Sequence, residues 1–273
     1  QHLANDQWDL DWAFERQIVT IPFEGESRKA VINMGKLGIL DALDAATGEY
    51  LFSMDMGLQN VVSAIDPDTG YKTINPYTVP QLEETRLICA NHYGAKSWPP
   101  AAFNPTTNRL YLPLNEGCME AGPEGRYEIL TTGVQMRQAL LPESNGRMGR
   151  IQALDLGSQE FDWLHRQPSP VISSILATAG GLVFAGDLNR NFKALDEATG
   201  EVLWETDLDD IPSSTIVTYA VEDIQYVAIA TGQTGYHVND WARMYDTFAE
   251  SQGMPVNDSP KGGAAIWVFT LAR

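Results

Sequence analysis

The sequence predicts an all-β fold built from about four repeated units of the β-propeller kind. Three observations predict it: a recurring motif of a turn followed by an aromatic residue, short apolar or alternating runs between turn residues, and little helical periodicity. Such runs are typical of strands, and self-similar units of this length indicate stacked or radial arrays. Propellers close with about four to eight blades, so four units could close alone. An open half-propeller would expose sheet edges, which isolated proteins avoid.

The repeat is clearest at residues 194–204, ALDEATGEVLW, and at residues 42–52, ALDAATGEYLF, where phenylalanine replaces tryptophan. Residues 153–163, ALDLGSQEFDW, keep the Asp and the Trp but carry Gln159 in place of the glycine. Residues 64–74, AIDPDTGYKTI, keep only the Asp and the Thr-Gly pair. In each full copy the Asp and Gly can close a tight turn between two strands, and we expect the terminal aromatic residue to face inward.

The other elements follow from local pattern. Strands are predicted at KAVINM, RLYLPL, GLVFAG, QYVAIATG and AAIWVFTL, with turns at NPTTN, DEATG and VEDIQ between them. Residues 236–251 could form one helix on a long loop. Residues 119–149 are polar, glycine-rich and weakly periodic, and we interpret them as an excursion between strands.

Composition limits the function. The chain has 273 residues, of which 44% are hydrophobic and 20% charged, as expected for a globular protein. A net charge of −18 makes nucleic acid and anionic membrane surfaces unlikely partners. The sequence contains no apolar window of about 18 residues, so it predicts no membrane span. The first 20 residues are too charged for a signal peptide, and the chain begins with Gln, so we expect a cytosolic protein or one whose leader has been removed.

Two cysteines, Cys89 and Cys118, do not make a zinc site. One disulfide in an exported protein and two buried thiols in a cytosolic one both fit the spacing. The four histidines show no ligand spacing, and the C-x-x-C-H pattern of a c-type haem site does not occur.

Several segments together resemble one family, the eight-bladed quinoprotein alcohol dehydrogenases that use pyrroloquinoline quinone (PQQ). The segments are, in order, WDLD (8–11), GKLGILDALDAATG (35–48), AKSWPPAAFNP (95–105), ATAGGLVFAGDLNRNFKALDEATGEVLW (177–204) and AAIWVFTL (264–271). The ALDEATGEVLW segment resembles the tryptophan-docking motif of that family. The resemblance implies that residues 1–273 are the C-terminal part of a single propeller domain, about four of eight blades. The N-terminal half would come from the same gene or from a second chain.

The resemblance implies the oxidation of an alcohol to an aldehyde or ketone, with hydride transfer to PQQ. Asp9 matches the family's general base, a role that suits a carboxylate within hydrogen-bond reach of the substrate hydroxyl. Asp9 and Asp11 would bind a cation, calcium or a lanthanide; members that use lanthanides resemble this chain in having an aspartate at the Asp11 position. The family's other metal ligands, a Glu and an Asn, would precede residue 1, so we expect the site on this chain alone to be incomplete.

Four residues match positions that contact the quinone in that family. Lys36 would hydrogen-bond the quinone oxygens. Ser97 and Trp98 match an Asn-Trp pair, with fewer hydrogen bonds available from serine than from asparagine; Trp98 could equally be a core residue. Tyr236 lies where the family often has a tryptophan near the cofactor carboxylates, and could supply a hydroxyl instead.

The resemblance also implies a setting for the protein. Cys89 and Cys118 match a family disulfide, which favours an exported, periplasmic protein. Electrons would pass to cytochrome c or another acceptor, and a homodimer is left open. The alternative is a non-catalytic propeller, a binding scaffold of the outer-membrane assembly type, which shares the ALDxxTG motif. WDLD and GKLG favour the enzyme. Ser97, Tyr236 and Ile172, which stands where the family often has a tryptophan, favour the scaffold.

Overall fold

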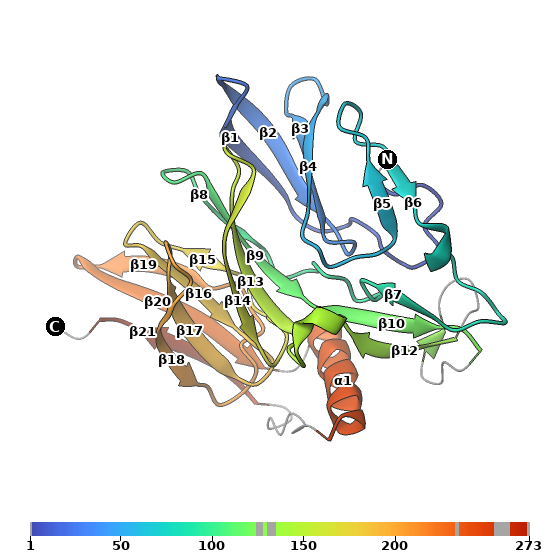
Figure 1. Ribbon diagram of the computed structural model, residues 1–273. Helices are drawn as coiled ribbons and strands as arrows, with labels where there is room; N and C mark the ends of the chain where they lie inside the picture. Colours follow the sequence, from blue (N-terminus) through green and yellow to red (C-terminus); the bar gives the residue numbers. More distant parts are fainter. Residues whose placement is uncertain (1, 124–127, 130–134, 233–234, 254–262, 272–273) are drawn as a thin grey trace. The chain divides into compact units, whose positions relative to one another are not determined.

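The computed structural model describes residues 2–123, 128–129, 135–232, 235–253 and 263–271. Among these residues the chain forms six antiparallel sheets and one α-helix, which confirms the all-β prediction (Figure 1). The chain divides into two compact units. Unit 1 comprises Gln1–Trp98, Leu114–Met148 and Leu156–Gln159, and unit 2 comprises Pro99–Pro113, Gly149–Asp155 and Glu160–Arg273. We still predict, from the family resemblance, that one propeller domain covers the whole chain.

Unit 1 begins with a complete four-stranded sheet of consecutive strands. Its members are β1 (Arg16–Phe23), β2 (Glu26–Met34), β3 (Ile39–Asp44) and β4 (Tyr50–Asp55). A hairpin follows, formed by β5 (Val62–Ile65) and β6 (Lys72–Ile74). The second four-stranded sheet has the order β11-β12-β10-β7, from β7 (Arg86–Cys89), β10 (Gly117–Ala121), β11 (Glu128–Ile129) and β12 (Gln135–Leu140). Two short 3-10 helices, η1 (Pro76–Thr78) and η2 (Pro142–Ser144), lie in connections.

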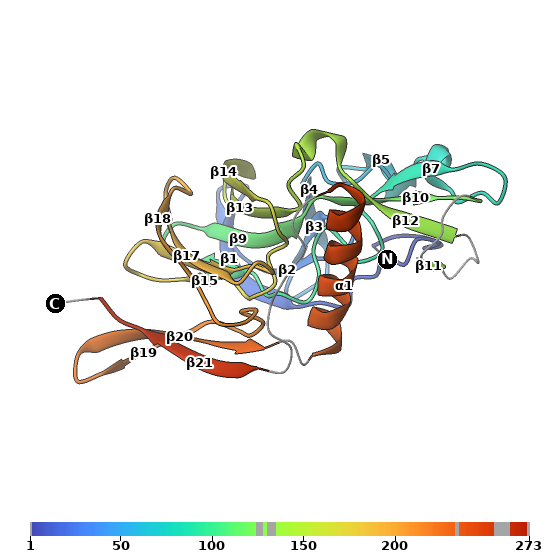
Figure 2. The same ribbon diagram turned by 90° about the horizontal axis from the view of Figure 1, so that it is seen from below.

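Unit 2 holds two further four-stranded sheets and one of three strands. The first has the order β14-β13-β9-β8, from β8 (Ala102–Asn104), β9 (Arg109–Asn115), β13 (Gly149–Asp155) and β14 (Glu160–Gln167). The second consists of β15 (Leu176–Ala177), β16 (Leu182–Gly186), β17 (Asn191–Asp196) and β18 (Val202–Asp207). The third, seen edge-on in Figure 2, consists of β19 (Val217–Val221), β20 (Ile224–Gly232) and β21 (Ala264–Phe269).

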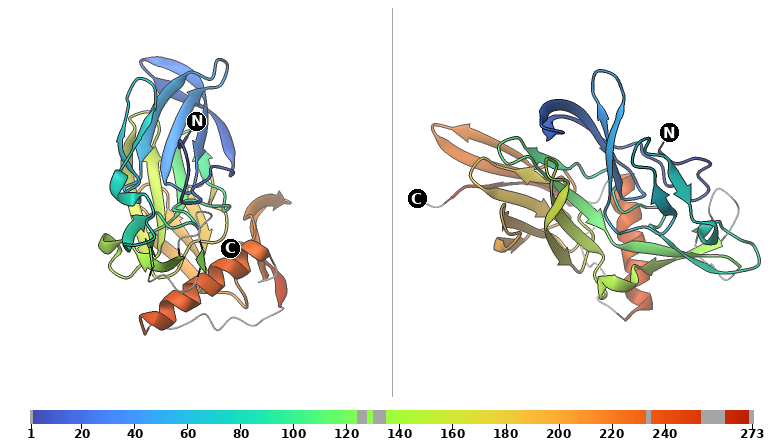
Figure 3. Two further views of the ribbon diagram at one scale, coloured as in Figure 1. Left: turned by 90° about the vertical axis from the view of Figure 1, so that its right-hand side faces the viewer. Right: turned by 45° about the horizontal axis from the view of Figure 1, so that its top comes forward.

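The helix predicted at residues 236–251 is present as α1 (Tyr236–Ser251), one uninterrupted helix drawn in orange in Figure 3. It buries one face, with Trp241 and Tyr245 at most 2% exposed. No helix in the described part of the chain is both long enough and apolar enough to cross a membrane.

The interpretation of residues 119–149 as a strandless excursion is wrong. The segment contributes to β10 and contains β12, which pair along five residues each. The reason lies in its apolar positions: Met119, Ala121 and Met136 are at most 1% exposed, and the burial of their side chains stabilises a sheet that the polar composition conceals.

The repeated motif forms the same turn at Asp44, Asp66 and Asp196, three of its four copies, as predicted. One carboxylate oxygen of Asp44, of Asp66 and of Asp196 accepts hydrogen bonds from the amides two and three residues on and from the threonine hydroxyl. The glycine that follows has φ between 72° and 77°, a conformation that few other residues adopt. Gln159, which replaces that glycine, adopts it too, with φ of 60°.

Tryptophan docking occurs between two neighbouring sheets of unit 2. The Trp163 indole N–H donates to the Glu197 carbonyl at 2.9 Å. The ring lies so close to Gly200 that a Cβ there would be 2.4 Å from it, so only glycine fits. Phe52, the equivalent aromatic of the first repeat, is 6% exposed, but Trp204 stays 41% exposed, so the prediction that the terminal aromatic faces inward is met only in part.

A buried carboxylate in unit 2 makes stability depend on pH. Burial raises the pKa of Asp187 to about 6, against the opposing charge of Lys193 at 3.5 Å and hydrogen bonds from the amides of Asn189 and Asn191. Because the pKa is higher in the folded state, this carboxyl group contributes its stabilisation below pH 4 and loses it as the pH rises to 6. The loss is about 3 kcal/mol at roughly 1.4 kcal/mol per pKa unit.

We therefore expect Asp187→Asn to remove this part of the pH dependence. The measurement is the free energy of unfolding in urea from pH 3.5 to 7.5, compared between the variant and the wild type. The difference between the two curves should change mainly between pH 4 and 6. Parallel curves over that range would show that Asp187 titrates elsewhere.

Candidate active site

The WDLD segment lies in unit 1, outside regular secondary structure, shortly before β1. Trp8, Leu10, Trp12 and Phe14 are buried, at 7% exposure or less. Burial alternates along this stretch, so the residues between these four face away from the core. The side chains of Asp9 and Asp11 accordingly remain 44% and 47% exposed and lie on one side.

Asp6 fixes the turn that presents Asp9. Its two carboxylate oxygens accept hydrogen bonds from the amides of Trp8, at 2.9 Å, and Leu10, at 2.8 Å. Asp9, between these two residues, has φ of 62°. A left-handed conformation at a residue other than glycine costs about 1–3 kcal/mol and is concentrated at functional sites.

Lys36 brings the two aspartates together. Its Nζ lies 3.1 Å from Asp9 Oδ2 and 2.6 Å from Asp11 Oδ1, and its backbone amide donates to the Asp11 carbonyl. The backbone of Gly94 approaches the lysine so closely that a Cβ at position 94 would lie 2.7 Å from Lys36 Cα. Both carboxylates therefore converge on one positive charge, which is the arrangement that a shared cation requires.

Ser97 and Trp98 lie on a loop that is bonded to Lys36. The Ala95 amide donates to the Lys36 carbonyl at 2.8 Å, which joins the two segments. Ser97 is 3% exposed, whereas Trp98 is 57% exposed and packs edge-to-face on Phe14, with ring centroids 5.1 Å apart. Within this chain Trp98 therefore lies outside the core, and its ring is accessible.

Sequence reasoning missed Lys96, which is only 1% exposed. Its Nζ donates to Glu15 Oε2 at 3.0 Å and to the Ser97 carbonyl at 2.8 Å. Burial lowers its pKa, opposed by the charge of Glu15. Nothing in AKSWPP distinguishes this lysine from an exposed one, because its partner is 81 residues away.

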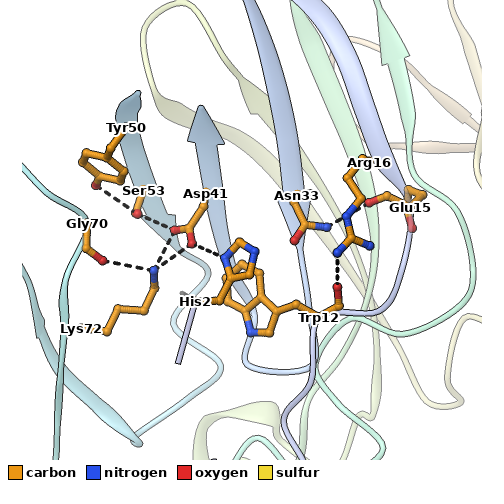
Figure 4. A network of polar contacts seen from close by, with 10 residues as sticks. All are labelled: His2, Trp12, Glu15, Arg16, Asn33, Asp41, Tyr50, Ser53, Gly70 and Lys72. Carbon is orange, nitrogen blue, oxygen red and sulfur yellow. Dashed lines mark hydrogen bonds and ion pairs between the residues drawn. The ribbon is translucent and has the colours of Figure 1, made fainter. Parts of the chain in front are cut away.

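A second polar network contacts Trp12, the residue that follows the WDLD segment (Figure 4). Asp41 accepts from the Lys72 ammonium at 2.8 Å and from the Ser53 hydroxyl at 2.6 Å, and contacts the His2 ring at 2.7 Å. Burial acts to raise the Asp41 pKa, but the bond with His2 and the Lys72 charge outweigh it, so the pKa is lowered. His2 stacks on Trp12, and Lys72 lies 5.4 Å from the Trp12 ring centre. The network thereby holds the tryptophan that follows Asp11.

Cys89 and Cys118 form a disulfide, as predicted from the family resemblance. The two residues are directly paired in the β7–β10 ladder, and both are at most 3% exposed. The bond is therefore structural, closing a loop between residues that are 29 positions apart.

Replacing both cysteines with alanine should lower the free energy of unfolding by about 3–4 kcal/mol, because the unfolded chain regains the entropy of that loop. Denaturant unfolding of the double variant, beside the oxidised wild type, measures this loss. A change below about 1 kcal/mol would contradict the loop-closure account.

The structure thus brings Asp9, Asp11 and Lys36 into direct contact and bonds them to the loop of Ser97 and Trp98. Tyr236 is the first residue of α1, but its side chain lies outside the described residues, so its role stays a prediction. Within the described ranges no group of three or more His, Cys, Asp or Glu side chains could hold a metal ion. Asp9 and Asp11 therefore offer a two-carboxylate donor set that needs further ligands.

This chain is similar to known proteins in sequence and in fold. Residues 124–227 match the PQQ family model described as glucose/ethanol/alcohol dehydrogenase, β-propeller domain. A lanthanide-dependent methanol dehydrogenase of Methylorubrum extorquens is 29% identical over 86% of this chain and 41% of its own length. The quinohemoprotein alcohol dehydrogenase ADH-IIG of Pseudomonas putida is 26% identical over 95% of this chain and 37% of its own length.

A solved structure of a europium-containing methanol dehydrogenase matches with a TM-score of 0.86 and 25% identity, over 99% of this chain and 50% of that one. The chain thus spans between about two fifths and one half of the length of these relatives. It shares their β-propeller fold in the blades that it holds. In sequence and structure, this chain resembles one half, the C-terminal one, of the PQQ-dependent alcohol dehydrogenases.

Proposed function

We propose that this chain forms the C-terminal half of a PQQ- and cation-dependent alcohol dehydrogenase, which oxidises an alcohol to an aldehyde or ketone. The observation that carries the proposal is the convergence of Asp9 and Asp11 on the Lys36 ammonium, at 3.1 and 2.6 Å, next to the loop of the exposed Trp98. The N-terminal blades would come from the same gene or from a second chain.

Asp9 is the proposed general base. Its carboxylate accepts the proton of the substrate hydroxyl while hydride leaves the adjacent carbon, so the alcohol loses two electrons and two hydrogens in all. PQQ, when bound, supplies the quinone that accepts the hydride. The strained backbone and the exposed side chain of Asp9 support this role.

Asp9 and Asp11 together are the proposed ligands of the cation, calcium or a lanthanide. Two carboxylates that already share one positive charge fit such an ion, and a second hard oxygen donor suits one of higher charge. Lys36 has three N–H donors, of which two face these aspartates, and its third would donate to a quinone oxygen.

Ser97, Trp98 and Tyr236 are the proposed cofactor contacts, with the Trp98 ring as a stacking surface. We place the protein in the periplasm, which the disulfide supports because such bonds persist in oxidising compartments. Electrons would leave to cytochrome c or another acceptor.

A dye-linked assay tests the proposal, with this chain combined with the blades that complete the propeller. Addition of PQQ together with calcium or a light lanthanide should give dye reduction that depends on alcohol. Without PQQ, or with a chelator present, the rate should fall to background. If neither metal supports turnover although PQQ binds, the alternative of a non-catalytic propeller scaffold is favoured.

A further inference from the structure

Lys96 is a fully buried lysine that directly precedes the proposed cofactor contacts Ser97 and Trp98, yet none of the roles above uses it. We propose that Lys96 is a positioning residue, which holds the ring of Trp98 in the orientation that receives the quinone. The consequence for the cofactor rests on the proposed function, but the effect on Trp98 does not.

The ammonium of Lys96 joins two segments that are far apart in sequence. It donates to the carboxylate of Glu15, four residues after the WDLD segment, and to the carbonyl of Ser97, on the loop. A lysine that is 1% exposed pays a large desolvation cost, so its charge persists only where such partners are held in good geometry. The loop of Ser97 and Trp98 and the chain that follows the WDLD segment are therefore held in place relative to each other within unit 1.

Phe14 contacts both Lys96 and Trp98 and so links the position of one to that of the other. The Lys96 ammonium lies 5.9 Å from the Phe14 ring centre, and the Trp98 ring packs on the same phenylalanine at an interplanar angle of 88°. Phe14 is itself 4% exposed and cannot move without disturbing the core. Because Trp98 is 57% exposed, this edge contact and the tether at Ser97 are the described features that set its rotamer.

The test uses Lys96→Met, which keeps much of the length and apolar volume of the lysine but removes the ammonium. Glu15, 26% exposed on its side chain, can remain solvated in this variant, so we expect the fold to persist. A matched control is Lys193→Met, because Lys193 is also buried and paired with a carboxylate, that of Asp187 in unit 2.

The measurement is the ¹⁹F NMR spectrum of the protein labelled with 5-fluorotryptophan, with the Trp98 signal assigned from Trp98→Phe. In Lys96→Met the Trp98 signal should move toward that of free fluorotryptophan and sharpen, while the signal of Trp163 stays unchanged. Lys193→Met should leave the Trp98 signal in place. A Trp98 signal at its wild-type position in folded Lys96→Met would overturn the proposal. If Lys96→Met does not fold, the Trp98 signal is measured instead in Glu15→Gln, which weakens the same interaction with Lys96. A wild-type Trp98 signal in that variant would likewise overturn the proposal.

A second arm measures PQQ binding by equilibrium dialysis with the completed propeller. In Lys96→Met the Trp98 ring is no longer held in one orientation, so PQQ binding should weaken on the order of 10-fold. Lys193→Met should leave PQQ binding unchanged. If the wild type binds no PQQ, the proposed function fails while the NMR result still decides the role of Lys96. If the wild type binds PQQ and Lys96→Met binds it equally well, the positioning role is overturned.

Discussion

Asp9→Asn should lower alcohol turnover by about 10²- to 10⁴-fold and leave the fold intact, because an amide of the same shape cannot accept the substrate proton. Asparagine tolerates the left-handed conformation better than most residues, so the φ of 62° at this position is no obstacle. The side chain is 44% exposed, and its replacement opens no cavity. Turnover is measured in the dye-linked assay, and the free energy of unfolding is measured in parallel.

The chain offers a close control in Asp223, which has φ of 62°, like Asp9, and lies exposed in the turn between β19 and β20. Asp223→Asn makes the same chemical change in the same backbone conformation without touching the proposed site. It should keep wild-type turnover. Equal turnover in Asp9→Asn and Asp223→Asn would remove Asp9 as the base.

Glu197→Ala should lower the free energy of unfolding by about 3–5 kcal/mol, since each buried donor left without a partner costs about 1–3 kcal/mol. One carboxylate oxygen of Glu197 accepts from Asn104 at 2.6 Å, from Tyr111 at 2.8 Å and from the Thr107 hydroxyl at 3.0 Å. Tyr111 is completely buried, and burial together with Glu197 raises its pKa. The carboxylate therefore joins the β8–β9 hairpin to the turn after β17.

Guanidinium unfolding measures this loss, and Glu201→Ala is its control, an exposed glutamate at the end of the same turn. Glu201→Ala should change the free energy of unfolding by less than about 0.5 kcal/mol. Glu197→Gln should fall between the two, because its amide keeps one acceptor oxygen. A Glu197→Ala variant as stable as Glu201→Ala would mean that the three donors find water instead.

The sequence predicts the features that depend on neighbouring residues. The Asp-Thr-Gly turns could be predicted because each aspartate bonds to groups within three residues of itself. The strands β16 (Leu182–Gly186) and β20 (Ile224–Gly232) and the helix α1 follow from short apolar patterns in the same way. Within the site, family resemblance and not local pattern led to Asp9, Asp11 and Lys36.

Features that depend on distant partners could not be predicted. Lys96 pairs with Glu15 across 81 residues, and Glu197 binds Asn104 across 93. Neither interaction leaves a periodic trace in the sequence, because a single polar or charged residue at each end makes it. The same holds for the β10–β12 pairing, which a few buried apolar residues stabilise within a polar segment.

The most direct test of the account is a single turnover without an electron acceptor. The completed propeller, loaded with PQQ and a light lanthanide under anaerobic conditions, is mixed with an alcohol while quinone absorbance and aldehyde or ketone are followed. We predict one carbonyl product for each quinone reduced in the wild type, and a far slower reaction in Asp9→Asn. Quinone reduction at the same rate in both proteins, or no product from the loaded wild type, would contradict the assignment of alcohol oxidation to this site.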